Sequence, residues 1–225
     1  MRTRIAAWTA LPIALAALFP GCASDSHPTN PAQPLKVLII GDSISIGYFE
    51  PLKQLLAGKT ELVHNAGNAQ HTRYGLEQLD AWLGDTPWDV IHFNHGLHDL
   101  KYVNDKGDRV APATGHLMIP PDEYARNLEQ LIKRLKKTRA KLIFATTTPV
   151  PEGAMGRVPG DAERYNRIAV PIMKKHDVQV NDLYAFALPR LASIQQPHDV
   201  HFTPAGYRLL AEQVADSILA TARHR

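Results

Sequence analysis

Apolar, strand-like runs alternate with amphipathic helical patterns along most of this chain, and this alternation limits the possible folds more than any other feature. Strands and helices in alternation predict a parallel sheet with right-handed crossovers and helices on both faces. At 225 residues the chain is too short for two domains of ordinary size, so we expect one three-layer α/β/α domain. Such sheets bind ligands beyond the carboxyl ends of their strands.

The expected strands are short, and several are unbroken apolar runs of the kind that a sheet buries on both faces. They span residues 36–40, 61–64, 89–94, 141–147 and 178–180. The loops that follow these strands are therefore where we expect the chemistry.

Two helices have clear sequence signals. One is predicted over 122–138, because two prolines precede it and its apolar residues fall on one stripe. The other begins after Thr203, a good N-cap that is followed by Pro204 at the first helical position. Residues 101–120 are long, polar and rich in glycine and proline, and we interpret them as an insertion beside the site and a candidate lid.

The N-terminal segment differs from the rest of the chain. Arg2 and Arg4 precede an apolar run that ends at Cys22, the only cysteine, so we predict a signal peptide over 1–22. Residues 18–22, LFPGC, resemble a lipobox, which would place a lipid on Cys22, and a plain secretory peptide cut nearby is the alternative. The polar, proline-rich residues 23–34 are then a tether to a catalytic domain over 35–225.

This organisation predicts an exported bacterial lipoprotein that faces the periplasm or the cell surface and meets a membrane only through its N-terminal lipid. The formal charge of +3 comes from 25 basic and 22 acidic residues, and removal of the two leader arginines leaves 23 against 22. A chain so balanced has no general electrostatic attraction to nucleic acid. We therefore expect no nucleic-acid partner.

The loop after the first strand contains a serine in a position suited to nucleophilic chemistry. Residues 41–45, GDSIS, lead directly into a helical stretch, which places Ser43 at a helix N-terminus. Aligned backbone N–H groups there can stabilise negative charge on a nucleophile or its adduct. An N-cap serine or a phosphate-binding turn fits this segment equally well. The G-x-S-x-G elbow of α/β-hydrolases is excluded, because Ser45 stands where the second glycine should be.

Three further segments carry polar groups at the ends of predicted strands or helices. Residues 65–68, NAGN, include Gly67, which would let a backbone N–H approach a ligand as an oxyanion donor must. Residues 94–99, NHGLHD, are dense in polar groups after an apolar run. Near the C-terminus, residues 198–207, HDVHFTPAGY, place His201 just before a capped helix, where it could be the general base of a distant serine.

In this order and spacing, the segments from residue 36 onwards resemble the blocks of the SGNH hydrolases, also called the GDSL family. The resemblance implies a three-layer α/β/α sandwich with a mostly parallel, flavodoxin-like central sheet. It implies that Ser43 is the nucleophile and His201 its base. It also implies an oxyanion hole formed by the N–H groups of Ser43 and Gly67 and a third-block side chain.

Two positions depart from the family pattern. The third block should read G-x-N-D, but His98 stands at the asparagine position. A neutral imidazole can donate one N–H, so His98 is the candidate donor and Asn68 its rival. The last block should read D-x-x-H, but His198 holds the aspartate position and Asp199 lies one residue nearer to His201. We predict Asp199 as the acid of a triad, and the alternative is a Ser-His dyad.

The expected activity is that of a serine ester hydrolase that removes acyl groups, particularly acetyl groups, from carbohydrate or a related extracellular ester without a cofactor. A lipase, lysophospholipase or thioesterase of the same fold is an alternative. Two other classes remain open: a carbohydrate-binding domain that lost its chemistry, and a metal-dependent hydrolase. The residues available for a metal are His92, His95, His98, His198, Asp199 and His201. Neighbouring histidines on a strand would point to opposite faces, so we expect no metal.

Overall fold

The computed structural model describes residues 33–223, of which residues 34–223 belong to one compact unit. The predicted signal peptide, Cys22 and most of the predicted tether lie outside the described residues. No helix within 33–223 combines the length and the hydropathy that a bilayer span requires.

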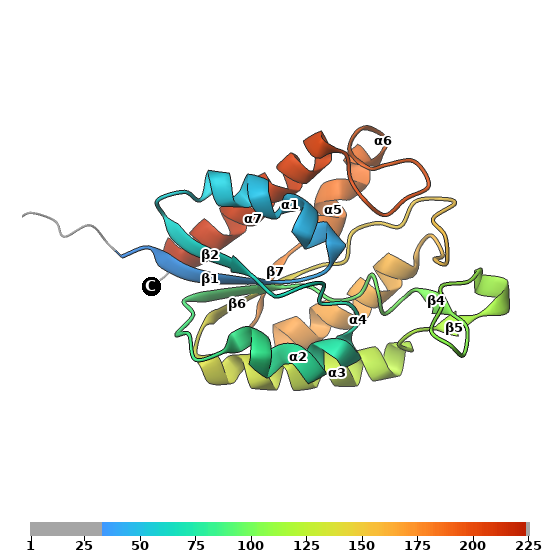
Figure 1. Ribbon diagram of the computed structural model, residues 1–225, viewed down its shortest axis with the longest axis horizontal. Coiled ribbons are helices and arrows are strands. Elements are labelled where there is room, and N and C mark those ends of the chain that lie inside the picture. Colours follow the sequence, from blue (N-terminus) through green and yellow to red (C-terminus); the bar gives the residue numbers. More distant parts are fainter. Residues whose placement is uncertain (1–32, 224–225) are drawn as a thin grey trace, which may run out of the picture. The chain divides into compact units, whose positions relative to one another are not determined.

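A five-stranded sheet forms the centre of the domain, and all its neighbouring strands are parallel (Figure 1). The strand order is β2-β1-β3-β6-β7. This is the flavodoxin-like order of doubly wound sheets, which confirms the predicted fold class. The strands span Leu35–Ile40 (β1), Thr60–His64 (β2), Val90–Phe93 (β3), Lys141–Ala145 (β6) and Gln179–Asn181 (β7).

Burial follows the position of each strand in the sheet. All of β3 and the last four residues of β1 are buried, because helices cover both faces of these central strands. At the edge, β2 alternates between half-buried and exposed residues. The predicted strand 141–147 ends two residues early, because β6 pairs with β7 only as far as Ala145 and Thr147 N–H then turns to the Asn166 side chain.

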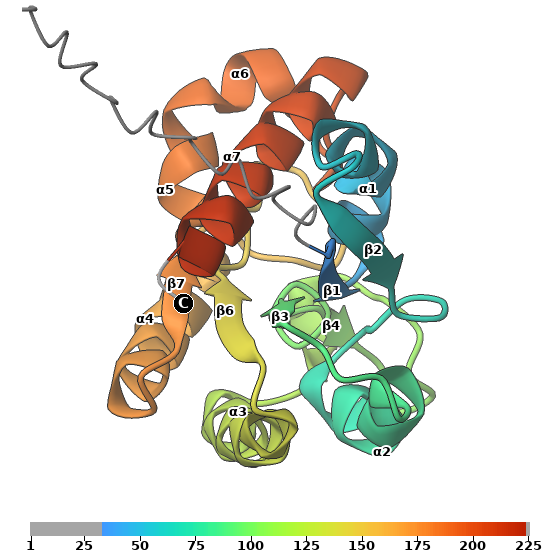
Figure 2. The same ribbon diagram turned by 90° about the vertical axis from the view of Figure 1, so that its left-hand side faces the viewer.

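Helices cover the sheet in two layers (Figure 2). On one face lie α1 (Ser43–Leu55), α5 (Leu183–Ala187), α6 (Leu191–Ile194) and α7 (Pro204–Arg223). On the other lie α2 (Thr72–Leu83), α3 (Pro121–Leu135) and α4 (Asp161–Lys175). Short 3₁₀ turns occupy Pro112–Thr114, Lys136–Thr138 and Leu188–Arg190.

Both helices with clear sequence signals form where expected. The apolar stripe of α3 is fully buried against the sheet, and the last residues of the predicted 122–138 segment form a 3₁₀ turn. The α7 helix begins at Pro204, and the Thr203 hydroxyl accepts a hydrogen bond from Gly206 N–H at 3.1 Å. The Thr203 cap fixes the start of α7 and therefore the end of the loop that carries His201.

The predicted insertion is folded. It contains a two-stranded antiparallel sheet, β4 (Tyr102–Val103) and β5 (His116–Leu117), which projects beyond the carboxyl ends of the central strands (Figure 1). Tyr102 N–H donates to Gly156 O at 2.8 Å, so the insertion is joined to the loop that follows β6. The insertion thus forms a small sheet beside the carboxyl ends of the central strands and is attached to the loop after β6.

Candidate active site

The turn between β1 and α1 presents Ser43 as the first residue of the helix. Asp42 is the N-cap, and its Oδ1 accepts a hydrogen bond from Ile44 N–H at 2.9 Å. Gly41 precedes it, and a Cβ at Gly41 would lie 2.6 Å from Ser45 Oγ. The turn is therefore closely packed, and it holds the Ser43 hydroxyl at the positive end of the helix dipole.

The fold brings His201 to Ser43 across 158 residues of sequence. His201 Nε2 lies 3.0 Å from Ser43 Oγ, and His201 Nδ1 lies 2.7 Å from Asp199 Oδ1. A carboxylate can only accept, so Nδ1 carries the proton of the neutral ring and Nε2 is free to accept from the serine. Serine, histidine and aspartate thus form one hydrogen-bonded line with the geometry of a nucleophile, a base and an orienting acid.

The unusual spacing of the last block is accommodated by the backbone of His198. His198 adopts a left-handed conformation with φ 58°, and its Nδ1 lies 2.9 Å from Glu152 O. The turn lets the Asp199 carboxylate fold back, where it also accepts from the His201 backbone N–H at 3.1 Å. His198 itself is exposed and its ring contacts the backbone of Glu152, so the family's acid position contributes no acid here.

The pKa values of Asp199 and Asp42, the two carboxyls of the site, are shifted in opposite directions. For Asp199, partial burial raises the pKa, but hydrogen bonds from the backbone and ring of His201 outweigh it, so the pKa is lowered from 3.8. For Asp42, complete burial raises the pKa despite the hydrogen bond from Ile44 N–H and the positive charge of Arg157. Asp199 is therefore ionised at neutral pH, as an acid that orients an imidazole must be.

Two backbone amides at the site are available to an oxyanion. Within the described residues, neither Ser43 N–H nor Gly67 N–H donates a hydrogen bond. Gly67 has φ 69°, a conformation that suits glycine, and its loop is attached to the nucleophile turn because Ala69 N–H donates to Gly41 O at 2.9 Å. Asn68 instead caps its own turn, with Oδ1 accepting from Gln70 N–H at 2.8 Å.

His98 is a largely buried imidazole that remains neutral. Burial, with a smaller contribution from the charges of Lys101 and Arg157, lowers its pKa to about 3. Its Nδ1 is buried without a hydrogen-bond partner in the described residues. An unpaired lone pair costs less than an unpaired buried N–H, so Nε2 carries the proton and can donate. The structure shows no hydrogen bond between His98 and the Ser43-His201 pair.

The histidines considered for a metal do not converge. His92 is fully buried in β3 beside the Asn181 side chain, and His95 Nδ1 lies 3.2 Å from Gln70 O. Within residues 33–223, no three His, Cys, Asp or Glu side chains come together in a way that could hold a metal ion. The described part of the chain thus offers no ligand set for the metal alternative.

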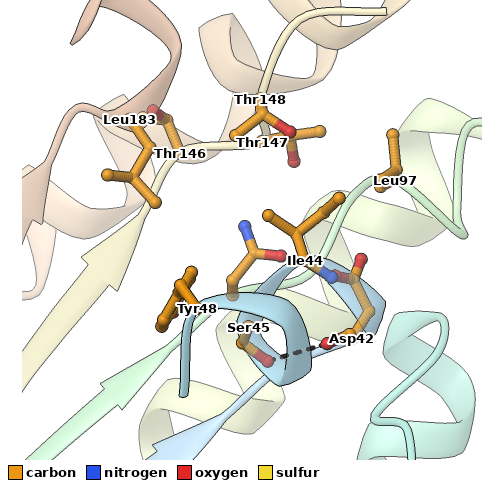
Figure 3. Close-up of a pocket in the computed structure, with 10 residues that line it drawn as sticks. Asp42, Ile44, Ser45, Tyr48, Leu97, Thr146, Thr147, Thr148 and Leu183 are labelled. Atoms are coloured by element: carbon orange, nitrogen blue, oxygen red, sulfur yellow. Dashed lines mark hydrogen bonds between the residues drawn. The ribbon is translucent and has the colours of Figure 1, made fainter. Parts of the chain in front are cut away.

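A second serine-histidine pair, Ser45 and His64, lies two residues from Ser43 along α1, and neither residue was assigned a role from the sequence. Ser45 Oγ is 2.7 Å from His64 Nε2. It also donates to Asp42 O at 2.8 Å (Figure 3). Asn65 Oδ1 accepts from Gly41 N–H at 2.8 Å and joins the second block to the first. The only sequence signal for the roles of His64 and Asn65 is their position at and directly after the end of β2, which pairs with the strand that leads to Ser43.

Figure 3 shows a small cavity behind the N-terminus of α1, with a volume of about 10 Å³. Neither Ser43 nor His201 lines it, and it has room for roughly one water molecule. This cavity is therefore too small for a sugar or an acyl chain, and such a group would reach the partly exposed Ser43 from solvent. The lining residues are Asp42, Ile44, Ser45, Tyr48, Asn94, Leu97, Thr146, Thr147, Thr148 and Leu183.

Comparison with known proteins places the sequence in a family. The sequence profile of the GDSL-like lipase/acylhydrolase family matches residues 39–209. A lipase/acylhydrolase from Enterococcus faecalis has a similar structure, with TM-score 0.70 and 20% identity over 84% of this chain and 96% of that chain. An acetyl xylan esterase gives TM-score 0.66 and 17% identity over 82% of this chain and 100% of that chain.

An acetylxylan esterase from Geobacillus stearothermophilus gives TM-score 0.63 and 18% identity over 82% of this chain and 94% of that chain. Identities this low establish a shared fold and leave the substrate open. Among curated proteins, none matches the sequence.

Proposed function

Because this chain belongs to the GDSL-like lipase/acylhydrolase family, we propose that it hydrolyses esters through Ser43 as nucleophile, His201 as general base and Asp199 as the acid that orients the base. One observation carries the assignment: the continuous line from Asp199 Oδ1 through the imidazole to Ser43 Oγ, with separations of 2.7 Å and 3.0 Å. These separations lie within the range that proton transfer requires.

The reaction has two halves. As Ser43 Oγ attacks the ester carbonyl, its proton passes to His201 Nε2, and the carbonyl oxygen becomes an oxyanion. Collapse of this intermediate breaks the bond to the alcohol, which takes the proton from Nε2 and leaves the acyl group on Ser43. Water then attacks the acyl-enzyme and gives its proton to Nε2, and the second collapse releases the acid and returns the proton to Ser43.

The oxyanion would be bound by the unpaired N–H groups of Ser43 and Gly67 and by Nε2–H of His98. The first two are supported by their free backbone donors, and the third by a ring that burial keeps neutral. Donors that are fixed before the reaction stabilise the developing charge without reorganisation. Asn68 is the weaker candidate, because its carbonyl oxygen already caps a turn.

For the substrate, we propose acetyl groups on an extracellular carbohydrate. Two observations support this choice: acetyl xylan esterases are among the proteins with this fold, and the predicted leader would export the chain away from cytosolic thioesters. The test is acetate release by the purified domain from acetylated sugars and polysaccharides, with Ser43→Ala as the blank. Faster hydrolysis of long-chain lipid esters in the same panel would replace this substrate with a lipase substrate.

The proposed location follows from Cys22, the candidate lipid attachment site, and from the tether that follows it. Intact-mass measurement of protein extracted from membranes should show a chain that begins at a lipidated Cys22. A fully soluble, unmodified chain with another N-terminus would exclude the anchor and leave plain secretion.

A further inference from the structure

Arg157 is a buried guanidinium with no carboxylate partner. It is 8% exposed, and its Nε–H donates to the backbone oxygen of Leu97 at 3.1 Å. Within residues 33–223 its terminal nitrogens make no hydrogen bond, and no carboxylate lies within 4.0 Å. A buried charge is costly unless it is paired, so an arginine held in this state is expected to have a ligand.

Two more cations come to the same place from the insertion that begins at Lys101. A Cβ on Gly156 would lie 2.4 Å from Cγ of Arg109, so the Arg109 side chain crosses the loop directly before Arg157. Neither Lys101 nor Arg109 forms an ion pair with another described residue. The pKa of Lys101 is lowered mainly by burial and to a smaller extent by repulsion from Arg157 and Arg109. The pKa of Arg157 is lowered to about 10, again mainly by burial and less by repulsion from Arg109.

Arg157 lies near the proposed catalytic line, because it binds the backbone oxygen of Leu97, one residue before His98, and Leu97 lines the same small cavity as Asp42. Asp42 and Asp199 are also the two carboxylates whose charges raise the pKa of Arg157. Asp42 already binds Ile44 N–H and Asp199 already binds His201, so these carboxylates do not pair with the arginine at hydrogen-bond distance. The two terminal nitrogens of Arg157 therefore remain free to bind an anionic group of a substrate.

We propose that Arg157, with Lys101 and Arg109, forms an anion subsite beside Ser43, so that the substrates of this esterase carry a carboxylate or a sulfate near the scissile ester. The inference rests on the proposed function and narrows its substrate class to esters of acidic saccharides. A guanidinium matches either group with two parallel N–H donors, whereas an ammonium supplies only a point charge. The insertion then serves as the cationic wall of this subsite.

The test compares matched esters that differ only at the acidic group: an O-acetylated methyl glucuronoside, the same acetylated methyl glucoside, and its sulfated derivative. The wild-type enzyme should have a kcat/KM about tenfold or more higher on an anionic ester than on the neutral one. Arg157→Gln should reduce kcat/KM on the anionic ester about 10- to 100-fold, mainly through KM, as expected for loss of a charged hydrogen bond. The same variant should change the neutral ester by less than about threefold.

A second variant protects the test against loss of folding, because Arg157→Gln also removes the bond to Leu97. Arg109→Gln leaves that bond intact and should reduce the preference for the anionic ester about threefold. The matched control is Arg223→Gln at the end of α7, some 28 Å along the helix axis from Pro204, which removes the same charge and should leave both esters unchanged. The preferred anionic ester distinguishes a carboxylate site from a sulfate site.

Binding is measured separately from turnover. In Ser43→Ala, calorimetry with methyl glucuronoside and with inorganic sulfate should detect binding that Arg157→Gln and added salt both weaken. Binding without hydrolysis of any ester would support the subsite and refute the proposed function. Hydrolysis with equal kcat/KM on neutral and anionic esters, or equal losses on both in the arginine variants, would overturn the subsite alone.

Discussion

The domain contains two serine-histidine pairs whose serines lie two residues apart at the start of α1, and only one of the pairs has the surroundings of a catalytic site. Ser43 is 3.0 Å from His201, and Ser45 is 2.7 Å from His64, so distance alone would favour the second pair. Ser45, however, is 2% exposed and shares its proton with the Asp42 carbonyl.

The two histidines also differ in their second partner. His201 Nδ1 faces the carboxylate of Asp199, whereas His64 Nδ1 faces the backbone oxygen of Asn65. A carboxylate stabilises the imidazolium that forms when a serine loses its proton, and a neutral carbonyl does so much less. The two pairs therefore differ in exposure of the hydroxyl and in the charge of the group behind the imidazole, and a short hydroxyl-imidazole contact by itself does not mark a nucleophile.

The largest expected effect on kcat comes from removing the Ser43 hydroxyl, and removal of the Ser45 hydroxyl is the comparison. Ser43→Ala should lower kcat about 10⁴- to 10⁶-fold on a small activated ester, without unfolding the domain. Ser45→Ala should lower kcat less than about tenfold but reduce the free energy of unfolding by about 1–2 kcal/mol, because it leaves His64 Nε2 without its partner. Kinetics and chemical denaturation measure both, and the reverse pattern would move the nucleophile to Ser45.

The acid of the first pair should have the next largest effect. Asp199→Asn should lower kcat by about 10³- to 10⁴-fold, because the amide no longer holds His201 in the right tautomer or stabilises its charge. Asp85→Asn, a change of the same type at an exposed residue, should leave kcat unchanged. A loss below about tenfold for Asp199→Asn would mean that Ser43 and His201 act as a dyad. The Ser43-His201 pair would then resemble the Ser45-His64 pair, which has no carboxylate behind its imidazole.

A smaller effect is expected at the oxyanion. His98→Ala should lower kcat about 10²- to 10³-fold while KM changes little, because the Nε2–H bond would strengthen only in the transition state. His64→Ala is the control, since it removes another imidazole whose pKa burial lowers, and it should affect mainly stability. Equal effects of the two substitutions on kcat would remove His98 from the oxyanion hole.

The smallest effect concerns pH. Burial lowers the pKa of His64 in the folded state from 6.5, despite the hydrogen bond to Asn65 O. The unfolded chain therefore binds a proton at this position more readily, and its contribution to stability is complete above pH 6.5 and decreases as the pH falls toward the folded pKa. The midpoint of thermal unfolding should fall less in His64→Gln than in the wild type between about pH 6.5 and 5. Parallel curves would assign the acid sensitivity to other buried histidines.

Much of the fold could be predicted because it depends on short-range patterns. The buried runs of β1 and β3 and the apolar stripe of α3 are visible in a few consecutive residues. The end of β6 was not predictable, because it depends on how far its short neighbour β7 extends. A strand ends where its partner ends, and that is a property of two distant segments.

The site divides in the same way. Ser43 at a helix start and His201 before a capped helix were recognisable locally, and ester hydrolysis followed from the resemblance that they carry. Arg157 had no signal, because it lies in an irregular loop and gains its significance only from Leu97 and the insertion.

The sequence by itself determined the layers of this protein, the family and the two ends of its proposed catalytic line. Only the tertiary structure decided which acid reaches His201, since the left-handed backbone of His198 turns Asp199 and not residue 198 toward the ring. It also decided which of two serines faces solvent. Periodicity depends on neighbours a few residues away, whereas a hydrogen bond across 158 residues depends on packing throughout the domain to within a few tenths of an ångström.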